Sequence, residues 1–266
     1  MRTSNPMLKK EAFRKEGASA SAMTIGGTVG KTFIMLILLL ATSVYSYIQM
    51  MQGTMKMPVL IGALIVAAII AFASMFFPRI SPFGAPIYAA VEGVVLGSIS
   101  AVYTMKFGDS IVLNAVLLTI SILFAMLVLY ATRVVKVTDK FRTGVMAATL
   151  GIMVMYLVVF LLNMFGVTVP YIHQGGTIGI IISAVVIVVA ALNLLLDFDL
   201  IENGVRSQAP KYMEWYTAMG LMLTLVWLYL EILRFVSYFN EKMTNKKILH
   251  EKCRIFYFQR YIECMV

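Results

Sequence analysis

Five acidic residues lie within or beside apolar stretches of the sequence, where an ionisable side chain is costly. Asp197 and Asp199 are expected to close one apolar helix, while Glu214 opens the next. Glu231 lies well inside that second helix, and Glu92 lies inside another apolar stretch, beside a glycine. Ionisable groups at membrane depth usually face a protein interior or a water-filled cavity. These five acids are therefore the candidate residues for chemistry.

The chemistry available to carboxylates in such a place is the binding of protons and cations. Two carboxylates that face each other in a low dielectric cannot both ionise cheaply, so the pair shares a proton and responds to pH. When ionised, the same oxygens suit Ca²⁺, a hard cation that takes oxygen ligands. A cluster of these acids predicts proton-sensitive binding or leak of a cation.

Simpler explanations exist for the same acids. Asp197 and Asp199 could be helix-end residues that face cytosolic water, although an acid at a helix C-terminus opposes the helix dipole. Glu231 could pair with Arg234, three residues later on the same helix. The residues alone leave both interpretations open.

The composition is that of a membrane protein. Of the 266 residues, 61% are hydrophobic and only 13% are charged, and the mean hydropathy is +0.88. A soluble domain carries about 25% charged residues. The net charge of +9 could suggest a nucleic-acid partner, but the cations flank apolar stretches, where they anchor helices to the inner leaflet. We therefore expect the lipid bilayer, and no nucleic acid, as a partner.

Seven stretches are apolar over the roughly 20 residues that a bilayer-spanning helix needs. They cover approximately residues 32–51, 57–77, 87–105, 111–131, 143–165, 177–197 and 213–235. Glycines and prolines separate them, as expected for turns. The sequence therefore predicts an all-α integral membrane protein with seven transmembrane helices.

The spans divide the chain into three regions. Residues 1–29 are basic and then rich in Gly, Ala and Ser, so we expect a flexible cytosolic tail. Residues 30–236 form the seven-helix membrane domain. Residues 237–266 mix bases with aromatic residues, which is typical of a helix that lies in the membrane interface.

The distribution of Lys and Arg predicts the orientation. With the N-terminus in the cytoplasm, thirteen Lys and Arg lie in the inner segments up to Lys211, and only Lys56 and Lys106 lie in outer loops. Seven crossings place the C-terminal tail outside, although the other seven of the 22 cations lie between Arg234 and Arg260. Alternatively, the last helix does not fully cross and both ends lie inside.

Small residues predict close contacts between helices. Gly93 and Gly97 form a GxxxG pattern in the third span, and Ala147 with Gly151 forms a similar pair in the fifth. Such residues let two backbones approach closely in lipid. The pattern indicates packing and carries no functional specificity.

Enzyme and cofactor motifs are missing from the sequence. It has no HExxH, P-loop or glycine-rich dinucleotide fingerprint, and the last predicted span has no lysine to hold retinal. Neither His173 nor His250 lies in a predicted span, and Cys253 and Cys264 lack the spacing of a metal or redox pair. We expect no enzymatic activity and no cofactor.

Three runs of sequence together resemble the bacterial branch of the Bax inhibitor-1/YccA superfamily, also called TMBIM. They are AVEGVVLGSIS in the third span, LLLDFDLIENG at the end of the sixth, and LVWLYLEILR in the seventh. The resemblance covers roughly residues 31–236. It implies a last helix that is central and wrapped by the other six. It also implies a pH-sensitive Ca²⁺ leak channel of the bacterial inner membrane, with a carboxylate pair from the last two helices as proton sensor.

Carried onto this sequence, the sixth-helix acid of that pair falls on Asp199, with Asp197 as the alternative register. The seventh-helix acid falls on Glu231, and Asp199 and Glu231 would then be the tentative Ca²⁺ ligands. This sequence departs from the family pattern, because the seventh-helix acid is usually aspartate and Asp-Thr-Gln becomes Asp199-Leu200-Ile201. The interval between the two acids is also longer.

The geometry of a helical hairpin favours a different pair. Asp199 and Glu214 are about equally far from a turn near Arg206, whereas Glu231 lies about 25 Å further along its helix at about 1.5 Å per residue. Asp197 or Asp199 would then pair with Glu214, and Glu92 could join them. The family's latch arginine has no counterpart inside a predicted span, and Arg79, between the second and third spans, is a distant candidate.

The resemblance also implies an alternative function. The superfamily includes a modulator of a membrane protease, so the chain could be a regulator that is not a channel. Such a regulator would bind other membrane proteins, such as a quality-control protease, through its cytosolic tail and its small-residue helix faces.

Overall fold

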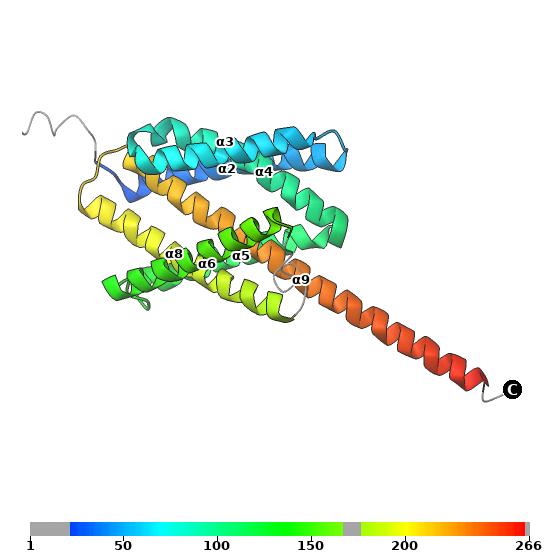
Figure 1. Ribbon diagram of the computed structural model, residues 1–266. Helices are drawn as coiled ribbons and strands as arrows, with labels where there is room; N and C mark the ends of the chain where they lie inside the picture. Colours follow the sequence, from blue (N-terminus) through cyan, green and yellow to red (C-terminus); the bar gives the residue numbers. More distant parts are fainter. Residues whose placement is uncertain (1–21, 167–176, 264–266) are drawn as a thin grey trace, which may run out of the picture. The chain divides into compact units, whose positions relative to one another are not determined.

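The computed structural model describes residues 22–166 and 177–263 of the chain, and the side chains of residues 22–166 and 178–241. Apart from a single bridge between Ala22 and Pro210, the secondary structure of these residues is helical. Figure 1 labels the helices. Their bounds are α2 (Ile25–Met51), α3 (Met57–Phe76), the short 3₁₀ helix η2 (Pro78–Ile80), α4 (Ser81–Phe107), α5 (Ser110–Ala131), α6 (Asp139–Met164), α8 (Thr177–Arg206) and α9 (Met213–Glu263).

Seven of these described helices are long and apolar enough to cross a membrane, so the predicted all-α fold with seven spans is confirmed. In α2, α3, α5 and α6 only 11 to 17% of the most apolar stretch is buried. Large apolar side chains exposed along whole helices need lipid around them. In α9 50% of that stretch is buried and in α4 56%, so these two helices pack on several sides.

Several helix boundaries differ from the prediction, most of all the end of α9, which lies at Glu263 and not at residue 235. The first helix begins at Ile25 and not at residue 32, so it takes in the end of the segment 1–29 that was expected to be a flexible tail. The third begins at Ser81, before the predicted residue 87, because Pro82 lies in its first turn and Pro86 is accommodated inside it. The sixth extends nine residues beyond Asp197, to Arg206. Hydropathy detects the part of a helix that lies in lipid, and polar turns at its ends escape it.

Local sequence explains where several helices start and stop. Thr138 caps α6, because its side chain accepts a hydrogen bond from the amide of Phe141, and Asp139 adds a negative charge in the first turn. Gly53 and Gly108 follow α2 and α4 with φ of 70° and 93°, a left-handed conformation that glycine adopts without strain. The predicted turns at these glycines are present.

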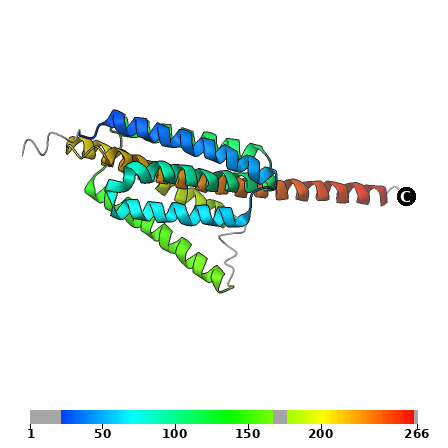
Figure 2. The same cartoon turned by 90° about the horizontal axis from the view of Figure 1, so that it is seen from above.

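The chain divides into two compact units. Unit 1 comprises Met1–Ser46, Met55–Gly97 and Asp197–Leu223, and unit 2 comprises Tyr47–Thr54, Ser98–Leu196 and Thr224–Val266. In unit 1, α2, α3 and the first part of α4 lie next to one another (Figures 1 and 2). The Ser46 hydroxyl donates to the carbonyl of Val94 at 2.7 Å, and Gly84 faces Ser74 of α3. The predicted GxxxG pattern lies at this α2–α4 contact, because Gly93 faces Leu39 and Thr42 while Gly97 faces Ser43.

In unit 2, polar side chains connect helices that are otherwise apolar. The Asn193 amide of α8 donates to the Thr149 hydroxyl of α6 at 2.8 Å. Ser100 of α4 and Tyr229 of α9 share a hydrogen bond of 2.7 Å. Hydrogen bonds between helices fix their positions in lipid, where apolar contacts alone discriminate little.

Candidate functional site: two buried glutamates on α9

Glu231, with 2% of its surface exposed, is one of two buried acids among the residues of α9 whose side chains are described. The Tyr156 hydroxyl of α6 donates to its Oε1 at 2.7 Å. The Arg234 guanidinium, three residues later on α9, lies 3.1 Å from the same oxygen. The pairing of Glu231 with Arg234 considered from sequence is therefore present, and this carboxylate does not bear an unbalanced charge.

The three side chains form a closed triangle. Arg234 also donates to the Tyr156 hydroxyl at 2.8 Å, and its guanidinium lies 5.2 Å from the centre of the Tyr156 ring, within the range of a cation–π contact. The Ser183 hydroxyl of α8 donates to the backbone carbonyl of Glu231 at 3.3 Å. In unit 2, α6, α8 and α9 therefore meet at one residue of α9.

A cavity of about 10 Å³ adjoins this triangle, space for about one water molecule. Its lining combines hydroxyl groups with the guanidinium, and consists of Tyr156, Gly179, Ile182, Ser183, Arg234 and Tyr238. The Arg234 side chain is 35% exposed, against 3% for that of Glu231. The arginine is therefore the member of the ion pair that reaches toward the surface.

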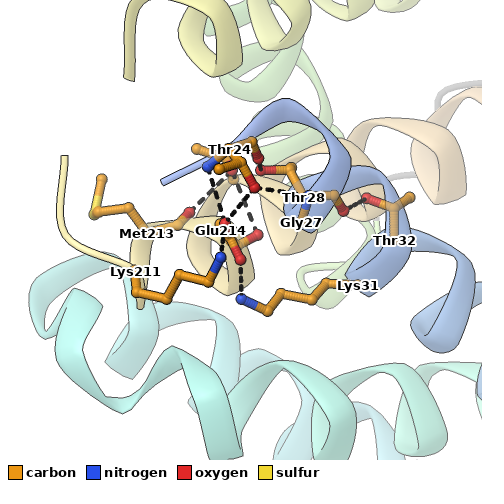
Figure 3. Close-up of polar contacts among 9 residues, drawn as sticks. Thr24, Gly27, Thr28, Lys31, Thr32, Lys211, Met213 and Glu214 are labelled. Carbon is orange, nitrogen blue, oxygen red and sulfur yellow. Dashed lines mark hydrogen bonds and ion pairs between the residues drawn. The ribbon is translucent and has the colours of Figure 1, made fainter. Parts of the chain in front are cut away.

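Glu214 is the second buried acid on α9 and has no exposed surface. It lies in the first turn of the helix, where a negative charge complements the helix dipole. The Thr24 amide and hydroxyl donate to its Oε1 at 2.9 and 3.0 Å (Figure 3). Lys211 forms an ion pair with Oε1 at 2.7 Å, and Lys31 of α2 forms another with Oε2.

Gly27 and Trp215 complete the surroundings of Glu214 in unit 1. A Cβ atom on Gly27 would overlap the Glu214 carboxylate, so a larger residue in the first turn of α2 would displace this carboxylate from its present position. The Lys31 ammonium lies 5.3 Å from the centre of the Trp215 ring. Two ammonium groups, a hydroxyl and an amide thus surround one carboxylate, an arrangement that favours its ionised form.

The sequence predicted that Glu214 pairs with Asp197 or Asp199. In the structure the groups that contact the Glu214 carboxylate are hydrogen-bond donors and ammonium groups from Thr24, Lys31 and Lys211. Asp197 and Asp199 are half-buried and lie inside α8, two turns before its end, so the expectation that they close the helix is wrong. The Asn203 amide donates to Asp199 Oδ2 at 2.9 Å. Asp199 belongs to unit 1 and Glu231 to unit 2, so the pair implied by the resemblance stays a prediction.

Glu92 and Arg79 lie elsewhere in unit 1. Glu92 is half-buried on α4, one turn after the buried Tyr88. Arg79 is exposed and lies on the short helix η2. Within the described residues, no group of three or more His, Cys, Asp or Glu is placed to hold a metal ion. The tentative Ca²⁺ ligation by Asp199 and Glu231 therefore also stays a prediction.

Sequence reasoning missed three partners of these acids. Tyr156 is 75 residues from Glu231, and Thr24 and Lys31 are 190 and 183 residues from Glu214. No local spacing could have paired residues so far apart. A weak signal did exist for Lys31, because it is a lone cation between the glycine-rich segment and the first apolar stretch.

Seven membrane-spanning helices with ionisable groups buried between them define a multi-pass integral membrane protein of the all-α class. The family described as Bax inhibitor 1 like matches residues 5–241. This match covers most of the chain, so the protein belongs to that family, as the three runs of sequence suggested. Among curated proteins no match is found.

Proposed function

We propose that the protein is a pH-sensitive passage for cations, with Ca²⁺ as the cargo, and that protonation of Glu231 controls its opening. The observation that carries the proposal is a carboxylate only 2% exposed in a membrane-spanning helix, paired with one arginine and hydrogen-bonded to one tyrosine. Buried ionisable groups in membrane helices commonly mark ion and proton pathways. The proposal involves no enzymatic step and no cofactor.

The physical basis is the strength of the Glu231 contacts in its two protonation states. Hydrogen bonds to an ionised group are about twice as strong as those between neutral groups, so ionised Glu231 ties α6 to α9 through Tyr156 and Arg234. Protonation removes the ion pair and leaves the Arg234 charge without its partner in a partly buried place. Arg234, already 35% exposed, then moves toward water, and the contact between α6 and α9 loosens. Acid should therefore favour the open state.

The choice of Ca²⁺ rests on the kind of ligand available. Asp197, Asp199 and Glu92 are half-buried carboxylates, and Ca²⁺ is a hard cation that takes carboxylate oxygens. The resemblance to a family with a pH-sensitive Ca²⁺ leak channel supports the same cargo. We also propose that the protein lies in a bacterial inner membrane with its N-terminus in the cytoplasm, because thirteen Lys and Arg against two favour that orientation.

The test is Ca²⁺ flux into liposomes that contain the purified protein, measured at mildly alkaline and mildly acidic pH. We expect flux to rise in acid. Glu231→Gln keeps the size of the side chain but cannot ionise, so this variant should show raised flux at both pH values. Asp199→Asn is the second arm, because the resemblance pairs Asp199 with Glu231; a weakened pH response there would support the pair.

Glu202→Gln is the matched control. Glu202 also pairs with an arginine on its own helix, Arg206, but the two side chains are 30% and 60% exposed. This variant should keep the normal pH response. The proposal would be contradicted by a Glu231→Gln protein whose flux responds to pH like the unchanged protein.

The alternative, a regulator that binds other membrane proteins, predicts a different result from removal of residues 1–21. Loss of partner binding with intact Ca²⁺ flux would favour the regulator. The cut should stop at residue 21 and not at residue 29, because Met23 and Thr24 pack against the turn before α9.

A further inference from the structure

The residues that lead into and begin α2 are fastened to the turn between α8 and α9. We call residues 22–31 the N-terminal strap. The Met23 amide donates to the Ala209 carbonyl at 2.8 Å, next to the antiparallel bridge between Ala22 and Pro210. All of these residues belong to unit 1.

Met23 fixes the beginning of the strap by burial. Its side chain is 2% exposed and sits directly against the backbone of Gly204, where a Cβ atom would lie 2.9 Å from the Met23 sulfur. Met23 forms one wall of an open, mainly apolar groove whose other walls come from α8, the turn and α9. Thr217 and Met213 of α9 are among the residues that line it.

Glu214 holds both ends of the strap. Thr24, next to Met23, gives the carboxylate its amide and its hydroxyl, and Lys31, at the far end of the strap, gives it an ammonium group (Figure 3). Lys211, from the turn itself, supplies the fourth donor. The buried Glu214 carboxylate, in the first turn of α9, thus contacts Lys31, which lies 183 residues earlier in the chain.

We propose that Glu214 is a latch that holds the N-terminal strap on the turn between α8 and α9. Ionised Glu214 balances the two lysines. Without that charge Lys31, whose side chain is only 16% exposed, would be left as an unbalanced cation in a partly buried place. The strap must then move toward water to hydrate Lys31, and the Met23 side chain leaves its buried position against Gly204.

The latch differs from the pair at Glu231 in what it controls. Glu231 joins α6 to α9 in unit 2, whereas Glu214 joins the N-terminal strap to the turn in unit 1. The proposal about Glu214 does not depend on ion flux, and its experiment has a separate readout.

The experiment measures how fast a cysteine introduced at position 23 reacts with a membrane-impermeant maleimide. The full chain carries Met23→Cys in a background of Cys253→Ser and Cys264→Ser, in detergent micelles so that both faces are accessible. A parallel chain with Ala22→Cys gives the rate for an exposed neighbour, since Ala22 is exposed and Met23 is buried. We expect the thiol at position 23 to react much more slowly than the thiol at position 22 while Glu214 is present.

Glu214→Gln should raise the reaction rate at position 23 by about tenfold or more, since labelling follows the population of the open strap. Lys31→Gln weakens one end of the strap only and should give a smaller rise, which provides a second test should the first variant not fold. Glu202→Gln, which removes an ion pair near the end of α8, should leave the rate unchanged. Two results would contradict the proposal. One is an equal labelling rate at positions 22 and 23 with Glu214 intact. The other is slow labelling of position 23 that persists in both Glu214→Gln and Lys31→Gln.

Discussion

Gly97→Val is expected to destabilise the protein by about 3 kcal/mol or more, the upper end of the range for overpacked sites. A Cβ atom at residue 97 would overlap the backbone carbonyl oxygen of Ser43 on α2. A flexible side chain could move aside, but a helix backbone cannot shift locally without losing its own hydrogen bonds. The measurement is the midpoint of thermal unfolding in detergent, where each 1 kcal/mol corresponds to about 2–4 °C for a chain of this size.

Gly151→Val provides the control for this substitution. Gly151 lies in α6, another membrane-spanning helix, and belongs to the second small-residue pair of the sequence, but nothing lies within 4 Å of a Cβ atom built there. Its valine variant should unfold within a few degrees of the unchanged protein. Similar losses in the two variants would show that the effect comes from valine in a membrane helix and not from the α2–α4 contact.

Arg234→Ala is expected to destabilise the protein by about 3 kcal/mol, the lower end of the range for breaking a buried ion pair. The loss leaves the Glu231 carboxylate, 2% exposed, without a countercharge from Arg234, while the Tyr156 hydroxyl still donates a hydrogen bond to it. The 35% exposure of the Arg234 side chain allows water to screen part of the charge, which is why the lower end applies. Thermal unfolding in detergent is again the measurement.

A double variant, Arg234→Ala with Glu231→Gln, separates charge from packing. It should recover much of the stability lost in Arg234→Ala, because the uncompensated carboxylate is gone. Arg206→Ala, at the exposed pair with Glu202, should cost less than about 1 kcal/mol. If the double variant were no more stable than Arg234→Ala alone, the arginine would act through its packing on Tyr156 and not through its charge.

The seven spans could be predicted because lipid imposes a length and a composition on every crossing helix. The ends of the helices could not, since the last turns of α8 contain Asp197, Asp199 and Glu202 and no longer look apolar. The start of α2 was missed for a related reason. Gly26, Gly27 and Gly30 give the segment the composition of a linker, whereas in the structure they lie in the first turns of α2 and the Glu214 carboxylate packs on Gly27.

The candidate site could be predicted only as far as local spacing reaches. The sequence showed that Glu231 and Glu214 are unusual, and the spacing of three residues offered Arg234 as a partner for Glu231. Tyr156 and Lys31 come from distant helices, and a tyrosine or lysine near a membrane span normally indicates an interface anchor. Only tertiary packing distinguishes an anchor from a partner.

The length of α9 determines which part of this helix extends beyond the bilayer and is accessible to a protease. At about 1.5 Å per residue its 51 residues extend for about 75 Å, more than twice the roughly 30 Å of a hydrocarbon core. Much of the helix must therefore lie in water or among headgroups. It contains Lys246 and Lys247, after which trypsin cleaves in an accessible chain. If the chain crosses a bacterial inner membrane seven times with its N-terminus in the cytoplasm, as we propose, trypsin added to intact spheroplasts should shorten the protein, whereas inverted vesicles should protect that end.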